Sequence, residues 1–463
     1  MTASALVEMR ASGQISAVDL VSHFLETVEA HNPVLNAVVT VTKESALDRA
    51  RAMDQGLIEP GILWGLPFVD KDLTNRAGVP TKAGSRIFAD AKPATTSDPM
   101  PEALDRAGGI SLGKSAVCEF GLTSYTESQI LPPTANPHNL EVGAGGSSGG
   151  AASAVAGGLV AFAPGSDGGG SVRIPAWTCG LVGIKPSRGL IPGGTGFDSL
   201  GGLVVPGPLA RNVEDAALLL DAMVGTNPTY RATMAPRGEG TFVHYASVQP
   251  RKLTMSVTTT SPWDDWVDIS LDPIARDALK AVADCASNLG HDVSDSPWVP
   301  QPGYADAFLT LWKASAVSLD ISLESRPLLE PITAYLIEQG EKLQAKDLAR
   351  ALNRLSLFEE HTLRAFADSD VVLTPGLAVE APRIGFYNYE DPMENFRQQV
   401  QVTPFSSFVN VCGLPALALP VLSTSERVPV GVQLIGKPGS EATLISLAAQ
   451  LEAAIGWDLS PHL

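Results

Sequence analysis

Apolar residues recur at helical spacing near the start of the chain. Ser16 and Asp19 have the spacing of a capping box, and the apolar residues that follow fall on one helical face: Leu20, Val21, Phe24, Leu25 and Val28. This pattern predicts a helix that ends near Pro33. By the same criteria we predict helices over 101–106, 151–157, 213–223, 273–289, 304–368 and 441–455, and strands over 35–42, 110–112, 253–257 and 370–374.

Two runs of glycine stand apart from this periodicity, and each contains a serine. Ser147 lies within 145–150, and Ser171 follows three glycines in 165–171. Glycine lets a backbone turn sharply and present its N–H groups to a ligand. A serine hydroxyl beside such donors has what acyl transfer requires, a nucleophile and a site for the developing oxyanion. The histidines supply no convincing base, so the best candidate is Lys71, which follows an apolar run at an expected strand end.

The order and spacing of these pieces resemble a known family. Lys71 lies 76 residues before Ser147, which lies 24 residues before Ser171. Further matching motifs are Gly113-Lys114, Glu119-Phe120, Asn136-Pro137, 183–189, 413–417 and 429–436. The set resembles the amidase signature family, whose members hydrolyse amides with a Ser–cis-Ser–Lys triad. Within that family the chain is more similar to broad-specificity amidases and aminohexanoate (nylon oligomer) cyclic-dimer hydrolases than to other branches.

The resemblance implies a role for each site residue. Lys71 corresponds to the base, Ser147 to the bridging serine on a cis peptide bond, and Ser171 to the nucleophile. The backbone N–H groups expected to form the oxyanion hole are those of Gly168, Gly169, Gly170 and Ser171. No metal or organic cofactor is expected.

The resemblance also implies the fold. We expect one large α/β/α domain over 1–463, in which helices cover both faces of a central twisted mixed β-sheet. Its parts would be a core at 60–225, a variable helical insert at about 263–368 and a C-terminal return to the core at 370–463. Length alone would have favoured two domains.

The predicted activity is hydrolysis of an amide C–N bond through a Ser171 acyl-enzyme, with esterase or carbamate hydrolase side activity. The family builds its acyl pocket from variable loops, which here are 121–133, the region around Trp177 and 396–409. Their apolar residues predict a small aryl or alkyl amide substrate, and the expected contacts are Tyr125, Ile130, Trp177 and Phe405. Two alternatives stay open: an amidotransferase A-type subunit for tRNA-dependent amidation, and an inactive binding relative.

Composition narrows the partners. The chain has 463 residues, of which 44% are hydrophobic and 18% charged, as in a globular protein with a large core. Its net charge of −18 disfavours nucleic-acid and anionic-membrane surfaces, which attract basic patches. No apolar run approaches the ~20 residues of a membrane span, no signal-peptide pattern is present, and the four cysteines are far apart. We therefore expect a cytoplasmic homodimer that acts on a small-molecule amide, with no nucleic-acid or membrane partner.

Residues 108–115 match the Walker A pattern of NTPases. That motif works as a loop between a strand and a helix. Here it contains the strand-like Ile110-Ser111-Leu112 and follows a predicted helix. The match therefore predicts phosphate binding poorly.

The frame Gly145-x-Ser147-x-Gly149 also fits the nucleophile elbow of an α/β-hydrolase esterase, as does the frame centred on Ser148. That fold requires a strand just before the serine, and 137–143 has no strand pattern. The downstream His361 and His462 lie in a predicted helix and at the extreme terminus.

Charged residues near the motifs are interpreted as structural. Asp167 and Arg173 are expected to hold the glycine-rich loop through hydrogen bonds or an ion pair, and Lys114 and Lys185 to be structural or surface lysines.

Lys71 itself must lose its proton to act as a base, although the pKa of a free lysine is ~10.4. Burial without a paired carboxylate would lower this pKa by roughly 3 units. Asp70 and Asp72 flank Lys71, but strand alternation should point both to the opposite face.

Overall fold

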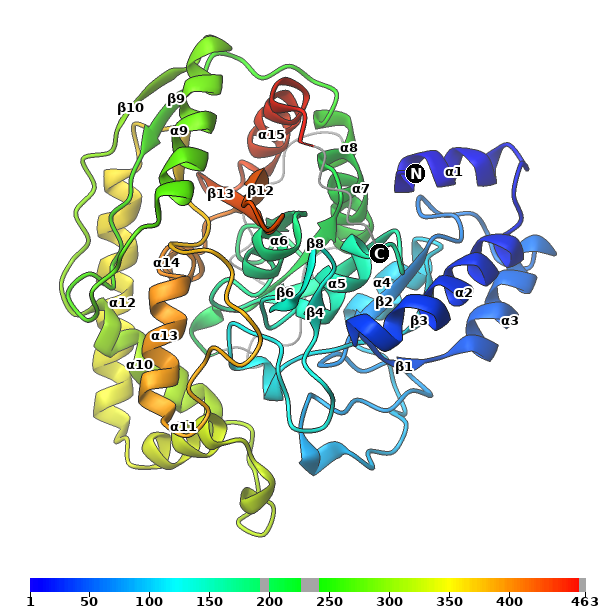
Figure 1. Ribbon diagram of the computed structural model, residues 1–463, viewed down its shortest axis with the longest axis horizontal. Helices are drawn as coiled ribbons and strands as arrows, with labels where there is room; N and C mark the ends of the chain where they lie inside the picture. Colours follow the sequence, from blue (N-terminus) through cyan, green and yellow to red (C-terminus); the bar gives the residue numbers. More distant parts are fainter. Residues whose placement is uncertain (192–199, 226–240, 458–463) are drawn as a thin grey trace.

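A long mixed β-sheet runs through the computed structural model, which describes residues 1–191, 200–225 and 241–457 (Figure 1). From one edge to the other, its strands are β10 (Asp292–Asp295), β9 (Thr254–Val257), β11 (Val371–Pro375), β13 (Pro429–Gly436), β12 (Ala416–Ser423), β7 (Val182–Lys185), β8 (Val205–Ala210) and β6 (Phe162–Asp167). β9 pairs in parallel with β10 and β11, and every pair from β11 to β6 is antiparallel.

A three-stranded sheet continues the layer beyond β6. Its order is β1 (Val38–Val41), β3 (Ile110–Ser115) and β2 (Pro67–Lys71), with β2 parallel to β3 and β2 beside β6. Lys71 is the last residue of β2 and pairs with Ser115. The parallel register therefore brings the carboxyl ends of both strands to the same place, next to β6.

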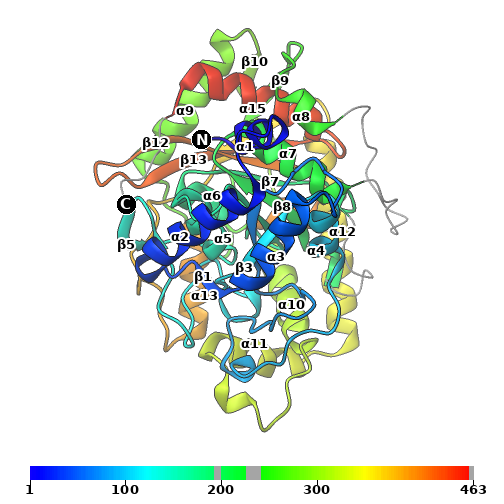
Figure 2. The same cartoon turned by 90° about the vertical axis from the view of Figure 1, so that its right-hand side faces the viewer.

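Helices cover both sides of the sheets. The helices that pack around the main core are α1 (Ala3–Ala11), α2 (Ala17–Leu35), α3 (Lys43–Asp54), α4 (Pro99–Arg106), α5 (Gly149–Ala156), α6 (Arg173–Cys179), α7 (Val213–Val224), α8 (Phe242–Tyr245), α9 (Pro273–Asn288) and α15 (Glu441–Ile455). α9 and α15 pack on β12 and β13 from one face and α6 packs on them from the other (Figure 1). α2 and α3 cover the outer side of the three-stranded sheet (Figure 2). The buried side chains between these layers form the main core.

A second, aromatic core lies under the remaining helices. These are α10 (Tyr304–Val317), α11 (Pro331–Glu341), α12 (Ala345–Ala365), α13 (Pro392–Val402) and α14 (Ser407–Val411), which Figure 1 shows together at one side of the sheet. The core under α10, α12, α13 and α14 includes Trp263, Trp298, Tyr304, Phe308, Phe358, Phe396 and Phe408, whereas α11 packs in a smaller cluster with Leu122 and Leu329. The aromatic core also includes Val372 and Ile435 from the sheet, so the bundle is packed onto the strands.

Most predicted elements are confirmed. Ser16 and Asp19 form the capping box of α2, and α5, α7, α9 and α15 match their predicted positions. The end predicted for α2, near Pro33, is confirmed to within two residues: the helix includes Pro33, continues to Leu35 and ends where Asn36 adopts a left-handed conformation. Only one backbone hydrogen bond is lost at such a proline.

The prediction that 304–368 is helical throughout is confirmed only in part. The chain forms three helices there, and 318–330 separates the first two. Asp320 has a positive φ of 52°, and Pro327 and Pro331 lack the N–H groups that would continue a helix. The apolar residues have helical periodicity on both sides of the break, so the break is not apparent from the sequence pattern.

Candidate active site

Lys71 lies at the junction between the two sheets and is almost completely buried. Its Nζ is 2.9 Å from Ser147 Oγ, 2.9 Å from Ser166 Oγ and 3.2 Å from the Ser166 carbonyl oxygen. Ser166 belongs to β6 and Ser147 precedes α5. Three separate elements thus hold one amine in place.

Burial lowers the pKa of Lys71 to about 8, and the charges of Cys118 and Asp167 oppose the shift. The flanking carboxylates have other partners, as the strand alternation predicts. Asp70 accepts hydrogen bonds from Arg76 and Ser111, and Asp72 accepts from the backbone N–H of Lys82. The predicted direction of the pKa shift is therefore confirmed, and its cause is desolvation.

The two glycine-rich runs meet beside this lysine. The Gly146–Ser147 peptide bond is cis, and the Ser148 N–H donates to the Ser171 carbonyl oxygen at 3.3 Å. A Cβ at position 146 would lie 2.5 Å from the Tyr125 backbone. A Cβ at position 170 would lie 2.6 Å from Ser406 Oγ, and φ there is +133°. Only glycine fits at these two positions.

The glycine loop, by which we mean Gly168, Gly169, Gly170 and Ser171, is held by a buried carboxylate. Asp167 Oδ1 accepts from the Gly170 N–H at 2.8 Å, and Oδ2 accepts from the Val172 N–H at 3.1 Å. The amide of Gly170 is thus occupied, which removes it from the predicted set of oxyanion donors. The amides of Gly168, Gly169 and Ser171 have no acceptor among the residues that the structure describes.

Arg173 completes this support, as predicted for the Asp167–Arg173 pair. Both side chains are fully buried, and the guanidinium donates to Asp167 at 2.9 and 3.0 Å. It also donates to the Ser406 carbonyl oxygen and to the side chains of Asn410 and Gln433. Arg173 holds the pKa of Asp167 below its usual range despite burial. The loop is therefore attached to distant C-terminal segments by charge-assisted hydrogen bonds.

Lys114 and Lys185 are structural, and neither lies at the surface, since both are fully buried. Lys114 donates to the Thr74 carbonyl oxygen and to Thr81 Oγ1, and Lys185 donates to the Pro186 carbonyl oxygen at 2.9 Å. Among the described residues no group of three or more His, Cys, Asp or Glu side chains is placed to hold a metal ion.

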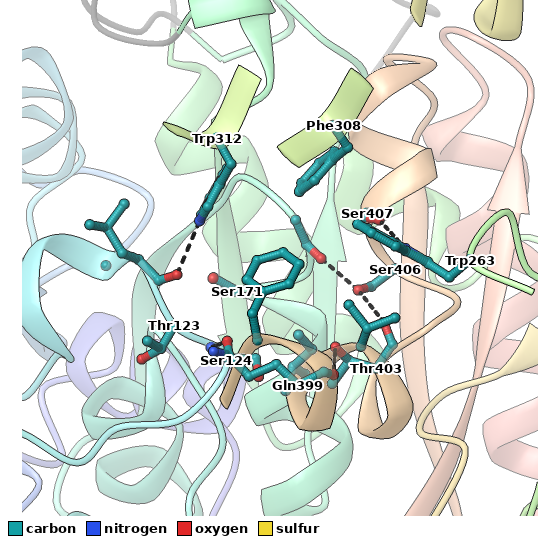
Figure 3. Close-up of a pocket in the computed structure, with 16 residues that line it drawn as sticks. Thr123, Ser124, Ser171, Trp263, Phe308, Trp312, Gln399, Thr403, Ser406 and Ser407 are labelled. Carbon is teal, nitrogen blue, oxygen red and sulfur yellow. Dashed lines mark hydrogen bonds between the residues drawn. The ribbon is translucent and has the colours of Figure 1, made fainter. Parts of the chain in front are cut away.

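A cavity opens above the glycine loop, with about 490 Å³ of empty space including its mouth (Figure 3). Gly169 and Ser171 line it together with Ile174, Trp263, Phe308, Trp312, Phe396, Val400 and the loop 121–124. Its polar side chains are Thr123, Ser124, Ser171, Gln399, Thr403, Ser406 and Ser407, and no charged side chain appears in the lining that the structure describes. The cavity therefore suits a neutral, largely apolar molecule.

The four predicted pocket residues lie elsewhere. Trp177 is fully buried beneath the sheet and donates its indole N–H to the Val432 carbonyl oxygen. Phe405 packs in a small core with Ala378, and Tyr125 stacks on Tyr387 behind the cavity. Ile130 is half-buried and does not line it. The predicted segments 121–133 and 396–409 do contribute, but through other residues, because Tyr125 and Phe405 are buried in the core.

The residues that the sequence analysis missed are Trp263, Phe308 and Trp312, which come from the helical insert and the segment before it. Phe308 and Trp312 are four positions apart, so they share one face of α10. The spacing of four residues predicts that the two rings share one helix face. It does not predict that this face borders the cavity, because that depends on how the helix packs in the fold.

The competing motifs do not form their sites. The Walker-like segment contains β3 and follows α4, as predicted. Residues 139–143 do form a strand, β5 (Asn139–Gly143), which corrects the sequence interpretation, but it forms a hairpin with β4 (Ala135–Asn136) and a bridge with Arg383, outside the large sheet. His361 contacts the Val299 carbonyl oxygen, and His462 lies outside the described residues.

A pair of buried carboxylates lies at the seam between the helical insert and the loop 119–129. Glu119 accepts hydrogen bonds from Ser85 Oγ at 2.6 Å and from the backbone N–H of Glu330 at 2.9 Å. Glu330 precedes α11 and accepts from the Gln129 N–H. Burial and the charge of Glu119 raise the pKa of Glu330 to about 8. The joint between the insert and the loop 119–129 therefore depends on the protonation of a carboxyl group.

Comparison with known proteins adds to this geometry. A family model described as Amidase matches residues 19–445. AmiB2 of Mycobacterium tuberculosis, which is named as an amidase, is 36% identical over 460 residues, which cover 98% of this chain and 96% of that protein. A 6-aminohexanoate-cyclic-dimer hydrolase of Paenarthrobacter ureafaciens is 31% identical, over 98% of this chain and 95% of that protein.

Solved structures agree with these matches. A 6-aminohexanoate cyclic dimer hydrolase complexed with substrate has a TM-score of 0.90 at 29% identity, over 99% of this chain and 97% of that one. A bacterial aryl acylamidase of the amidase signature family has a TM-score of 0.87 at 26% identity, over 99% and 96%. The predicted fold, a central mixed sheet covered by helices, is confirmed.

Proposed function

Because the chain belongs to the amidase family and is an amidohydrolase, which cleaves amide C–N bonds, we propose that it does so through an acyl-enzyme on Ser171. The observation that supports this most is the 2.9 Å contact between Lys71 Nζ and Ser147 Oγ in a buried site, next to a cavity that Ser171 lines.

Lys71, Ser147 and Ser171 would act as one proton relay. Neutral Lys71 takes the proton of Ser147 Oγ while Ser147 takes that of Ser171, and Ser171 Oγ attacks the carbonyl carbon. The amides of Gly168, Gly169 and Ser171 are the candidate donors to the oxyanion. Collapse of the tetrahedral intermediate breaks the C–N bond. Ser147 passes its proton to the leaving nitrogen as Lys71 returns a proton to Ser147. Water then cleaves the ester by the reverse route.

The lining of the cavity supports a small neutral substrate with an aryl or alkyl group. Many of its polar groups are already engaged within the protein: Ser407 Oγ contacts Trp263 and Tyr304, and Gln399 accepts from the Ser124 N–H and donates to Asn395. A charged substrate would lose its hydration without gaining a partner. Esters and carbamates of the same shape are proposed as secondary substrates.

Purified chain assayed alone tests this proposal. It should release amine from a neutral anilide or aliphatic amide without ATP, glutamine or a second protein. If it is inert on a panel of anilides, amides and esters but becomes active with a tRNA-amidating partner, the amidotransferase alternative is correct. If it binds these amides and cleaves none under either condition, it is the inactive binding relative.

We also propose a cytoplasmic homodimer. No helix among the described residues is both long and apolar enough to cross a bilayer. All four cysteines are free, which suits a reducing compartment. Light scattering at several protein concentrations tests the dimer, and a mass of one chain at all of them would contradict it.

A further inference from the structure

Phe308 and Trp312 form an aromatic wall at one side of the cavity, and we use that name for these two residues. Their rings are stacked, with centroids 5.5 Å apart and planes 17° from parallel. Phe308 is buried and Trp312 is half-buried. Both point from α10 towards the space above Ser171 (Figure 3). A flat hydrocarbon surface thus faces the proposed nucleophile.

The aromatic wall lies directly against the glycine loop. A Cβ at position 168 would be 3.7 Å from a ring carbon of Trp312, and one at position 169 would be 3.7 Å from Phe308 Cζ. A methyl group at either position would just touch a ring, so the rings and the loop backbone together bound one side of the cavity. A planar group that enters the cavity, attached near the scissile carbonyl, can lie in van der Waals contact with a ring of the wall.

Trp312 is also fixed from its polar end. Its indole N–H donates to the Leu122 carbonyl oxygen at 3.3 Å, across the cavity from α10. Leu122 follows Gly121, where a Cβ would lie 3.3 Å from Ser147 Oγ. The hydrogen bond sets the distance between the insert and the loop beside the proposed relay. It therefore limits the thickness of a group that can enter.

We propose that Trp312 is the main specificity-determining residue of this chain and that it selects neutral amides with a planar aryl group over aliphatic amides of similar length. This rests on the proposed function, because it concerns the same cavity. Nothing charged lines the cavity within the described ranges, so selection depends on shape and ring contact. An aromatic contact of this kind discriminates between similar groups by roughly 10-fold or more.

Two matched pairs of neutral substrates test the proposal: benzamide with hexanamide, and acetanilide with N-hexylacetamide. The quantity measured is the ratio of kcat/KM within each pair, which is independent of the fraction of folded enzyme. We expect wild type to favour the aryl member of at least one pair. Trp312→Ala should reduce that ratio by about 10-fold, and Trp312→Phe, which keeps a ring, by less than about 3-fold.

Trp266→Ala is the matched control. Trp266 contacts Trp263 and Phe396 from outside the cavity and stacks with Arg397, without lining the cavity. Its removal should leave both ratios unchanged. If Trp312→Ala keeps the ratio of wild type in both pairs, or if Trp266→Ala lowers it equally, the proposal is wrong.

Binding separates this proposal from the proposed function. Calorimetry with acetanilide and benzamide on Ser171→Ala measures affinity without turnover. Adding Trp312→Ala should weaken the tighter of the two by about 10-fold. Wild type that cleaves no amide, together with this loss of affinity, would overturn the proposed function and keep the aromatic wall. Cleavage with unchanged affinity in the double variant would overturn the aromatic wall alone.

Discussion

The glycine loop and the aromatic wall face each other across one cavity, yet they are built in opposite ways. The loop consists of backbone amides and one hydroxyl, and Asp167 and Arg173 hold it from beneath. The wall consists of two rings on one helix, and a hydrogen bond from Trp312 to the Leu122 carbonyl oxygen attaches it to the segment 121–124 on another side of the cavity. Chemistry that depends on backbone positions tolerates almost no substitution, whereas a ring surface can be altered in steps. The loop should therefore control whether an amide is cleaved, and the wall should control which one.

The largest effect should follow from Ser171→Ala, since no neighbouring oxygen can replace the attacking one. We expect kcat to fall on the order of 10³-fold or more for every substrate, aryl or aliphatic. Mass spectrometry with a fluorophosphonate should show one adduct on wild type and none on the variant. An adduct on Ser148 would instead support the nucleophile elbow of an α/β-hydrolase esterase. A loss of kcat that differs between aryl and aliphatic substrates would contradict the view that the loop controls cleavage and the wall controls substrate choice.

Lys71→Met should abolish activity to a similar degree while sparing the fold. Burial lowers the pKa of Lys71 to about 8, whereas the pKa of the same lysine in the unfolded chain is ~10.4. Between these two pH values the unfolded state binds more protons than the folded state, so the free energy of unfolding rises with pH. Below about pH 8 wild type carries the cost of a buried charge that methionine lacks. The variant should thus be at least as stable as wild type at pH 7.

The same pKa gives a kinetic expectation for wild type. Its kcat should climb towards alkaline pH with an apparent pKa near 8, for aryl and aliphatic amides alike. A profile that stays flat from pH 6 to 9, with chemistry rate-limiting, would exclude lysine as the base.

Arg173→Met should act on stability more than on substrate choice. It leaves the buried Asp167 carboxylate without its cation, which costs about 3–5 kcal/mol of unfolding free energy. Arg251→Met removes the exposed partner of Asp370 and is the matched control, with a much smaller expected loss because solvent screens that ion pair. Denaturation in urea compares the two. Equal losses would show that the buried pair has no special role in the loop.

A smaller effect is expected at the seam, from Glu330→Gln. The pKa of Glu330 is raised to about 8, so between ~4.3 and about 8 the folded chain binds more protons and stability falls as pH rises. Above pH 8 the glutamine variant should exceed wild type by at least about 1 kcal/mol, and near pH 4 the difference should vanish. Thermal unfolding at pH 5 and pH 9 measures it, with the exposed Glu324→Gln as control. A constant difference at both pH values would contradict the assignment.

The sequence predicted the loop far better than the wall, and the reason is physical. Gly146 and Gly170 occupy positions where any Cβ would collide, so the requirement appears directly in the sequence. Asp167 and Arg173 are six residues apart and interact locally, so their role was also predictable. Tyr125 and Trp177 were predicted to line the pocket, but large aromatic side chains also fill protein cores. Only the packing of the folded chain decides between these two places.

The same contrast holds for the fold. Helices with clear caps, such as the one that starts after Ser16, were placed well because their signals are local. The break at 318–330 and the strand β5 depend on contacts that no short window contains. Whether the chain behaves as one domain stays a prediction, which the cooperativity of unfolding would test.

The contacts of Arg173 have a consequence for how the protein comes into being on the ribosome. Its partners Ser406, Asn410 and Gln433 lie 233, 237 and 260 positions later in the chain. During synthesis, Lys71, Ser147 and Ser171 all leave the exit tunnel long before these partners exist. A nascent chain that stops short of Pro404 holds every group of the proposed relay but lacks the C-terminal partners that anchor Arg173 and, through Asp167, the glycine loop. Hydrolysis should therefore begin only when translation is nearly finished, and truncated products should be catalytically silent.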